Sequence, residues 1–442
     1  MMNNPLPCTV VSNPRLREEY HVYHHPSGLD IYIFPKAMST SYVLFGTKYG
    51  SIHNVIPMEH EECTVTVPDG IAHFLEHKLF ACEDGSDAFE RFSDYGADAN
   101  AYTSFNKTCY LFSCTDRFED SLAELLDFVT HPYFTPESVA SEIGIIAEEI
   151  RMYDDNPSDR CYYGMLEGMY REHSIRRNIC GSAESISCIT APLLYQCYHT
   201  YYRLSNMALV VCGNVSDDTV LSVADRILPH TPSLPPFPVK NENEKEGEEV
   251  NAPYVEYEMQ VSKPMFNIGF KDTAISEDPV ARQKKDAAMS ILDEMLFARS
   301  GELYQSLIEQ NLISPSLSYG YTMSSAAAYH SIAGESDDPK QVLSRILDYI
   351  DQTRKKGLSR DAFDLAMRVM YAEFVKSFDS TESVANNLFS FICEDSDLLS
   401  FQDVLESVTF EEVCHLFERA FLPHTVTLSV VRPLNTKSNE QE

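Results

Sequence analysis

Hydrophobic and polar positions follow the same coarse order in both halves of the chain. In the first half, apolar alternation predicts a hairpin in 18–36, turning at the sequence PSG, and a further strand in 41–51. The segment 206–215 (NMALVVCGNV) predicts a strand near the end of this half. Helical periodicity is found in 69–81, 87–95, 117–130, 136–154 and 190–202, and again from about Ser216.

The second half repeats this order of strands, helices and a closing strand. Its predicted elements are strands in 254–262 and 265–272, a helix in 279–300, strands in 317–323 and 326–336, a long helical region in 339–393 and a last strand in 425–433. The repeated order suggests an old internal duplication, with a sheet and its helices in each half.

A polar segment divides the two halves. Residues 230–253 (HTPSLPPFPVKNENEKEGEEVNAP) are rich in Pro, Asn, Glu and Lys and have almost no apolar periodicity. A chain of 442 residues also exceeds the usual ceiling for one hydrophobic core. We therefore expect a first domain in 1–230, a linker in 231–253 and a second domain in 254–442.

Composition narrows the class of protein. The formal net charge of −33 argues against a nucleic-acid partner, because phosphate binding needs clustered Lys and Arg. Two readings of the acidity stay open, a solvated surface or an acidic chamber that attracts basic peptides. No run of eighteen apolar residues predicts a membrane span, and the first twenty residues do not read as a signal or transit peptide, so a cytoplasmic location is expected.

The twelve cysteines are scattered and form no C-x-x-C pair. In a long chain without a secretion signal they predict reduced, mostly buried thiols rather than a disulfide framework. A zinc site built on cysteine is therefore disfavoured.

Candidate chemistry is concentrated in GIAHFLEHKLF (70–80). On a helix, His73 and His77 lie one turn apart on the same face, with Glu76 beside them. Two imidazoles on one face can hold a zinc ion, and H-x-x-E-H is the inverse of the zincin motif H-E-x-x-H. Glu76 would then take a proton from zinc-bound water and pass it to the leaving amine.

A catalytic zinc needs a third protein ligand. The helical segment 136–154 offers Glu142 and Glu149, which are seven residues apart and share a face across two turns. The alternative is that His73 and His77 are ordinary histidines of an amphipathic helix and bind no metal. Four other histidines have no such context and are expected to face solvent, namely His24, His25, His53 and His60.

These segments resemble the pitrilysin family of inverted-motif zinc peptidases, which includes insulin-degrading enzymes and the mitochondrial processing peptidase. The length is similar to its short, two-domain branch. The resemblance implies an α+β fold of two tandem homologous αβ-roll domains, each a mainly antiparallel sheet packed on helices, that form half of a clam-shaped chamber. It also implies a catalytic first domain and a non-catalytic second domain that serves as chamber wall and dimerisation surface.

The resemblance also implies roles for individual residues. It assigns His73, His77 and Glu149 to one zinc ion per chain, Glu76 to general-base catalysis and Glu142 to supporting the ligands. The segment 96–114 (GADANAYTSFNKTCYLFSC) is similar to the family's edge strand and its neighbour, where a peptide substrate adds as an extra strand. This places Asn100, Ala101, Tyr102 and Thr103 beside the scissile bond, and an ordinary hairpin is the alternative.

One departure from the family pattern affects the expected assembly. Many members carry an arginine, followed seven residues on by a tyrosine, that binds substrate backbone and the tetrahedral intermediate. In 303–321 of this chain Ile308 stands at the expected arginine position, no arginine is present, and Tyr319 or Tyr321 would have to serve as the tyrosine. We therefore expect a homologous partner subunit to supply the arginine and tyrosine, with a homodimer less favoured.

Two classes of function follow. The first is a zinc metalloendopeptidase that hydrolyses enclosed peptides or unfolded segments as the metal-bearing subunit of a heterodimer. The second is a non-proteolytic peptide-binding or scaffold subunit that retains zinc. Energy-driven unfolding by this chain is not supported, because the sequence has no G-x-x-x-x-G-K-[ST] phosphate loop.

Overall fold

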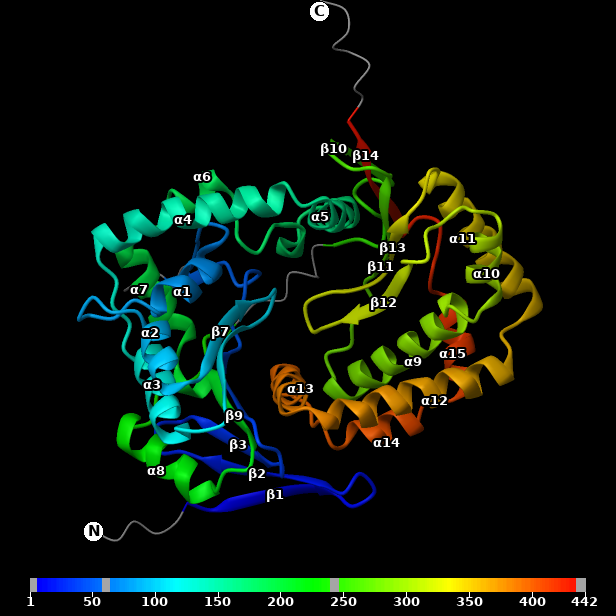
Figure 1. Ribbon diagram of the computed structural model, residues 1–442. Helices are drawn as coiled ribbons and strands as arrows, with labels where there is room; N and C mark the ends of the chain where they lie inside the picture. Colours follow the sequence, from blue (N-terminus) through cyan, green and yellow to red (C-terminus); the bar gives the residue numbers. More distant parts are fainter. Residues whose placement is uncertain (1–5, 58–63, 239–245, 435–442) are drawn as a thin grey trace, which may run out of the picture. The chain divides into compact units, whose positions relative to one another are not determined.

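The computed structural model describes residues 6–57, 64–238 and 246–434 (Figure 1). The chain divides into two compact units, and each contains residues from both halves of the sequence. The first unit consists of Met1–Ile150, Asn178–Lys240 and Val375–Ser400, and the second of Arg151–Arg177, Asn241–Phe374 and Phe401–Glu442.

The first unit is built on a seven-stranded sheet with the order β1-β2-β3-β9-β4-β8-β7. Neighbouring strands are antiparallel except β3 and β9, which run parallel. The strands are β1 (Cys8–Asn13), β2 (Glu18–His24), β3 (Asp30–Pro35), β4 (Ser41–Thr47), β7 (Asp98–Thr103), β8 (Thr108–Cys114) and β9 (Met207–Gly213), beside a separate pair, β5 (Val55–Pro57) and β6 (Thr64–Thr66).

Helices pack on both faces of this sheet. On one face, Tyr110 of β8 meets Phe128 of α3, with ring centroids 5.8 Å apart. On the other face, Gly46 of β4 lies under Phe389 of α13, so close that a Cβ on Gly46 would overlap the ring. The helices are α1 (Ile71–Leu79), α2 (Ala88–Tyr95), α3 (Phe118–Thr130), α4 (Pro136–Asp154), α6 (Ala183–Ile186), α7 (Ala191–Tyr201), α8 (Asp217–Ile227) and α13 (Thr381–Cys393).

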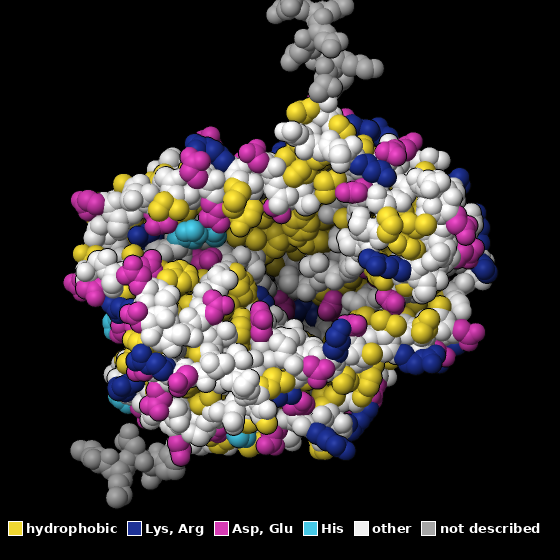
Figure 2. All heavy atoms as spheres, viewed as in Figure 1, with side chains coloured by type: hydrophobic (Ala, Val, Ile, Leu, Met, Phe, Trp, Pro, Cys, Tyr) yellow, Lys and Arg dark blue, Asp and Glu magenta, His cyan; other side chains and the backbone are white. Residues whose placement is uncertain are grey.

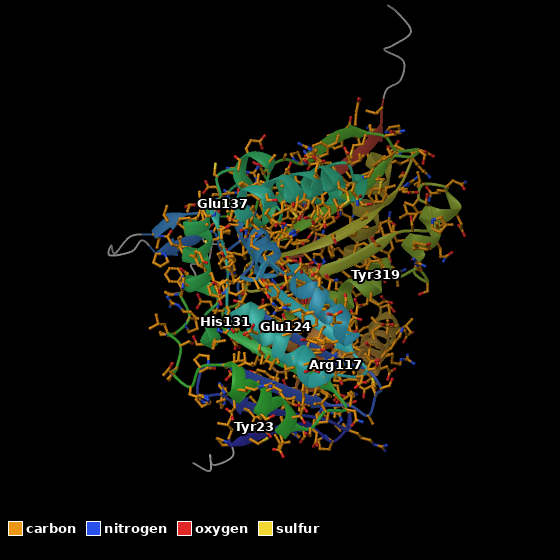
Figure 3. All side chains as sticks on the ribbon, turned by 60° about the vertical axis from the view of Figure 1, so that its left-hand side comes forward. Tyr23, Arg117, Glu124, His131, Glu137 and Tyr319 are labelled. Atoms are coloured by element: carbon orange, nitrogen blue, oxygen red, sulfur yellow. The ribbon has the colours of Figure 1, made fainter. Side chains whose placement is uncertain are left out.

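Helix α3 is joined to helix α2 by an ion pair. Figure 3 labels Arg117 and His131 at its two ends and Glu124 between them. Glu124 is buried and pairs with Arg91 of α2 at 3.1 Å, so the two helices are joined by a charge pair as well as by apolar contacts.

The second unit has a five-stranded sheet with the order β10-β14-β11-β13-β12, in which only β10 and β14 are parallel. Its strands are β10 (Tyr254–Met259), β11 (Met265–Asp272), β12 (Ser318–Met323), β13 (Ala328–Glu335) and β14 (Val426–Pro433). Its helices are α5 (Pro157–Met169), α9 (Pro279–Phe297), α10 (Glu302–Glu309), α11 (Pro339–Lys356), α12 (Arg360–Lys376), α14 (Phe401–Glu406) and α15 (Phe410–Phe417).

The predicted α+β class, with mainly antiparallel sheets packed on helices, is confirmed. The predicted ranges 1–230, 231–253 and 254–442 describe halves of the sequence, whereas the compact units exchange Arg151–Arg177 and Val375–Ser400. The exchanged helices are α5, which packs on β11 and β14, and α13, which packs on β4 and β9.

Acidic side chains are scattered among basic ones on the face drawn in Figure 2. Among the described residues, no helix has both the length and the apolar composition required to cross a bilayer.

Candidate metal centre

Helix α1 carries the three residues of the H-x-x-E-H motif. It begins after Gly70, which adopts the left-handed conformation with φ of 89°. Every residue of α1 except His77 is buried, because the helix packs under the sheet edge formed by β7 and β8. His73 and His77 lie on one face, with ring centroids 4.6 Å apart, as the one-turn spacing predicts.

Glu149 of α4 faces both imidazoles. Its Oε1 lies 3.6 Å from Nε2 of His73, and its Oε2 lies 3.3 Å from Nε2 of His77. The structure therefore brings together the two histidines and the remote glutamate that the sequence predicts as a ligand set.

Glu142, two turns earlier on α4, contacts the other nitrogen of His77. Its Oε1 lies 3.3 Å from Nδ1 of His77, and its Oε2 lies 3.6 Å from Nζ of Lys78. An acceptor at Nδ1 fixes the tautomer that leaves Nε2 free to bind a cation. Glu142 therefore lies beside His77, and its supporting role stays a prediction.

The pKa values of His77, Glu142 and Glu149 are shifted by the contacts between these side chains. Hydrogen bonds from His73 and His77 hold the pKa of Glu149 far below its usual range. Burial lowers the pKa of His77, but its bonds to Glu142 and Glu149 outweigh burial and raise that pKa to about 10. Burial raises the pKa of Glu142, and His77 and Lys78 more than offset this effect and lower it.

Glu76 lies in the same cluster but has a different environment. It is 8% exposed, and burial raises the pKa of its carboxyl group, partly offset by the nearby histidines and by Thr103. Thr103 Oγ1 donates a 2.6 Å hydrogen bond to Oε2 of Glu76. A buried carboxylate with a raised pKa is the group that general-base chemistry near neutral pH requires.

The four predicted substrate residues lie on β7, which is an edge strand of the sheet as expected. Their side chains divide between its two faces. Thr103 points to α1, whereas Tyr102 donates a 2.9 Å hydrogen bond to Asn386 of α13 and lines a groove together with Asn100. Ala101 donates its backbone N–H to the side chain of Asn100.

Cys180 joins the cluster, although sequence reasoning did not single it out. Its Sγ lies 3.8 Å from Nε2 of His73, and the donor atoms of His73, Glu149 and Cys180 all lie within 4.8 Å of one another. Cys180 stands in an irregular segment without helical or strand periodicity, so no sequence signal connects it to the motif.

The donor set fits zinc. Two imidazole nitrogens and a carboxylate oxygen are the ligand types of a catalytic zinc site, and all three are gathered from α1 and α4. The buried Nδ1 of His73 has no hydrogen-bond partner, which leaves Nε2 as the atom of that ring directed at the other donors.

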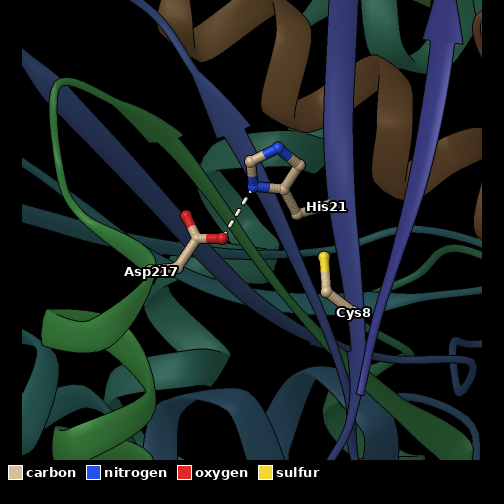
Figure 4. A group of neighbouring side chains, drawn as sticks. All are labelled: Cys8, His21 and Asp217. Carbon is tan, nitrogen blue, oxygen red and sulfur yellow. Dashed lines mark hydrogen bonds and ion pairs between the residues drawn. The ribbon is translucent and has the colours of Figure 1, made fainter. Parts of the chain in front are cut away.

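Two other groups of potential ligands occur among the described residues. Figure 4 shows Cys8, His21 and Asp217, where one oxygen of Asp217 accepts from His21 Nδ1 at 2.7 Å and from the Tyr23 hydroxyl at 2.6 Å. These bonds link β2 to the start of α8, and Cys8 is exposed on β1.

The second group corrects one expectation. His25 is buried rather than facing solvent, because it accepts from the backbone N–H of Ser27 and bonds Asp225 through Nε2 at 3.1 Å. With Nδ1 already accepting, Nε2 carries the proton and is not a ligand atom. His24 is exposed as expected, His53 is partly buried, and His60 lies outside the described residues.

The second unit holds the residues predicted at the arginine and tyrosine positions. Ile308 is on α10 and packs against the core of this unit. Both candidate tyrosines lie on β12, where Tyr319, labelled in Figure 3, donates to Glu294 at 2.6 Å and Tyr321 donates to Asp272 at 2.8 Å. Neither tyrosine has an arginine among these partners.

Two family models and several known proteins match this chain. Residues 67–183 match the model of the insulinase family (peptidase family M16), and residues 189–370 match that of the peptidase M16 inactive domain. The chain is 38% identical over 416 residues to the uncharacterized zinc protease YmfH of Bacillus subtilis, covering 93% of this chain and 96% of that protein.

Solved structures agree in fold. The putative M16-like peptidase from Alicyclobacillus acidocaldarius superposes with a TM-score of 0.88 at 29% identity, covering 96% of this chain and 99% of that one. A protease from Helicobacter pylori superposes with a TM-score of 0.80 at 17% identity, covering 94% of this chain and 100% of that one, which is a likeness of fold alone. This chain therefore belongs to the insulinase family of peptidases, the pitrilysin-like group that its sequence resembles.

Proposed function

We propose that this protein is a zinc metalloendopeptidase in which His73, His77 and Glu149 hold one zinc ion and Glu76 is the general base. The observation that carries the proposal is the convergence of both Nε2 atoms on one carboxylate, within 3.6 Å, beside a buried glutamate. The name of YmfH, a zinc protease, supports the same class.

The chain's own residues have separable tasks in this proposal. When bound, zinc lowers the pKa of a coordinated water and polarises the scissile carbonyl. Glu76 takes the proton of the attacking water at Oε1 and delivers it to the leaving amine, while Thr103 holds Oε2. Glu142 keeps His77 in the tautomer that presents Nε2.

The peptide substrate would add to β7. This strand is at the edge of the sheet and contacts α1, and an extended chain can pair with an edge strand through main-chain hydrogen bonds. In this arrangement Asn100, Ala101, Tyr102 and Thr103 position the substrate through their backbone, which selects peptides that are already extended.

A homologous partner subunit would complete the site, and a homodimer is less favoured. Ile308 supplies no positive charge, and loss of one oxyanion-stabilising donor typically costs about 3 kcal/mol of transition-state stabilisation. The match of 189–370 to an inactive domain supports a non-catalytic role for this part of the chain. Full peptidase activity of the purified chain alone would contradict the heterodimer.

The second candidate is a peptide-binding or scaffold subunit that retains zinc without turnover. The absence of an arginine in 303–321 favours it, because the chain then lacks part of the expected machinery. The two candidates differ in what they require of Glu76.

Glu76→Gln tests the proposal. We expect this variant to keep its zinc and lose peptide cleavage, because glutamine cannot accept the proton of water. Glu148→Gln is the matched control, since Glu148 is an exposed neighbour of Glu149 on the same helix. If cleavage by the chain with its partner were unchanged in Glu76→Gln, the peptidase proposal would be wrong.

A further inference from the structure

Cys180 is the one cysteine among the described residues whose sulfur lies within hydrogen-bonding range of a predicted zinc ligand. Its thiol is buried, 3.8 Å from Nε2 of His73 and within 4.8 Å of a carboxylate oxygen of Glu149. Cys82 is much closer to the motif in sequence, but its thiol contacts the backbone carbonyl of Phe80. Proximity in the fold therefore selects Cys180.

The segment that carries Cys180 is locked onto the start of α1. A Cβ on Gly70 would lie 2.4 Å from the carbonyl oxygen of Cys180, and a Cβ on Gly181 would lie 2.5 Å from that of Asp69. Both glycines have positive φ, and Ser185 Oγ donates to the Asp69 carbonyl at 2.8 Å. These contacts fix the position of the Cys180 thiol relative to His73, which lies four residues beyond Asp69.

Three of the distances between these donors are in the range expected around one tetrahedral ion. Zinc bonds of 2.0 to 2.3 Å correspond to ligand-to-ligand distances of about 3.3 to 3.8 Å in a tetrahedron. The observed distances from His73 Nε2 are 3.6 Å to Glu149 and 3.8 Å to Cys180, and His77 lies 3.3 Å from Glu149. Cys180 therefore lies within reach of an ion bound by His73 and Glu149, since its sulfur and their donor atoms are at most 4.8 Å apart.

We propose that the Cys180 thiolate is the fourth zinc ligand of the resting site and closes the position that a catalytic water must occupy. The inference rests on the proposed function, because it requires the zinc held by His73, His77 and Glu149. The thiol gives up its proton to solvent when the sulfur binds, and takes a proton back when water replaces it. The zinc would then have either four protein ligands, with Cys180 bound and no catalytic water, or three protein ligands and a water.

Cobalt substitution tests this coordination without relying on activity. The full chain is loaded with one equivalent of Co²⁺ in place of zinc, and its near-ultraviolet spectrum is compared with those of Cys180→Ser and Cys82→Ser. We expect a sulfur-to-cobalt charge-transfer band in the unmodified chain and in Cys82→Ser, and its loss in Cys180→Ser. Zinc affinity should fall by about tenfold or more in Cys180→Ser alone.

X-ray absorption of the zinc-loaded, unmodified chain gives a second readout that needs no variant. One sulfur at about 2.3 Å beside nitrogen and oxygen ligands supports the proposal. Stoichiometric metal with no sulfur ligand, and a spectrum unchanged in Cys180→Ser, overturns the inference while the peptidase proposal stands. Failure of the folded chain to bind any metal overturns both.

Discussion

Thr103 of β7 donates a 2.6 Å hydrogen bond to Glu76 of α1, which joins the predicted substrate strand to the predicted base. This bond stabilises the ionised carboxylate and opposes the effect of burial on its pKa. Thr103→Val removes the donor and keeps the shape. We expect kcat/KM at neutral pH to fall about tenfold, and the acidic limb of its pH profile to move to higher pH.

Thr66→Val is a suitable control, because Thr66 is exposed on β6. A profile that keeps its acidic limb in Thr103→Val, with only KM changed, would show that Thr103 acts on the substrate and not on Glu76.

The contact between Glu142 and His77 predicts a loss of metal affinity on substitution. Glu142→Ala removes the acceptor at Nδ1 of His77, and we expect zinc affinity to fall by roughly 10- to 100-fold, measured by competition with a chelator. Glu142→Gln restores an acceptor without the charge and should lose less. Equal affinity in all three proteins would exclude the supporting role.

The close approach between Gly70 and the backbone of Cys180 predicts a large cost for a single methyl group. Gly70→Ala places a Cβ 2.4 Å from a carbonyl oxygen at a φ of +89°, so we expect the free energy of unfolding to fall by about 2 kcal/mol or more. Gly144→Ala, in α4 with no atom within 4 Å of the new Cβ, should instead gain about 0.5 to 1 kcal/mol. Urea titration compares the two.

A buried ion pair in the second unit predicts a specific acid sensitivity. Glu246 lies 2.6 Å from Lys271 and accepts from the backbone N–H groups of Glu172 and His173. Burial raises the pKa of Glu246, but these partners outweigh burial and lower it from 4.5 to about 2. Because the folded pKa is the lower one, the stabilisation is complete above about pH 4.5 and is lost as pH falls towards 2.

The stabilisation amounts to about 3 kcal/mol by linkage. Glu246→Gln should therefore unfold more easily at neutral pH and lose less of its remaining stability on acidification. Glu249→Gln, at an exposed position of the same segment, should keep the acid sensitivity of the unmodified chain. Denaturant titrations at several pH values between about 3 and 7 measure the difference.

Local periodicity predicted most of the elements that carry the site. Helices α1 and α4 were expected from their patterns, because their apolar positions recur at helical spacing and are buried in the fold. Strand β7 was expected from the family resemblance alone, since none of its residues is buried. The approach of Glu149 to His73 followed from ligand chemistry and family resemblance, since no local pattern links residues so far apart.

Other features depend on tertiary packing and have no local signal. Strand β1 is mostly exposed, so its residues show no alternation. The predicted helical region 339–393 is in fact α11, α12 and α13, and α13 packs in the first unit because its apolar face fits β4 and β9. Cys180 lies near His73 because Gly70 and Gly181 allow their two backbone segments to approach closely, and no local pattern predicts this contact.

Because α5 and α13 are exchanged, each half of the sequence contributes one helix to the compact unit that is built mainly from the other half. A protease that cleaved within 231–253 would divide the sequence into two halves, but neither half would contain a complete compact unit. A fragment ending there would leave Gly46 and the strand around it bare, because the Phe389 ring that covers Gly46 belongs to the other piece. Each half expressed by itself would hold all the strands of its own sheet but would lack one helix that packs on that sheet, α13 for the first half and α5 for the second.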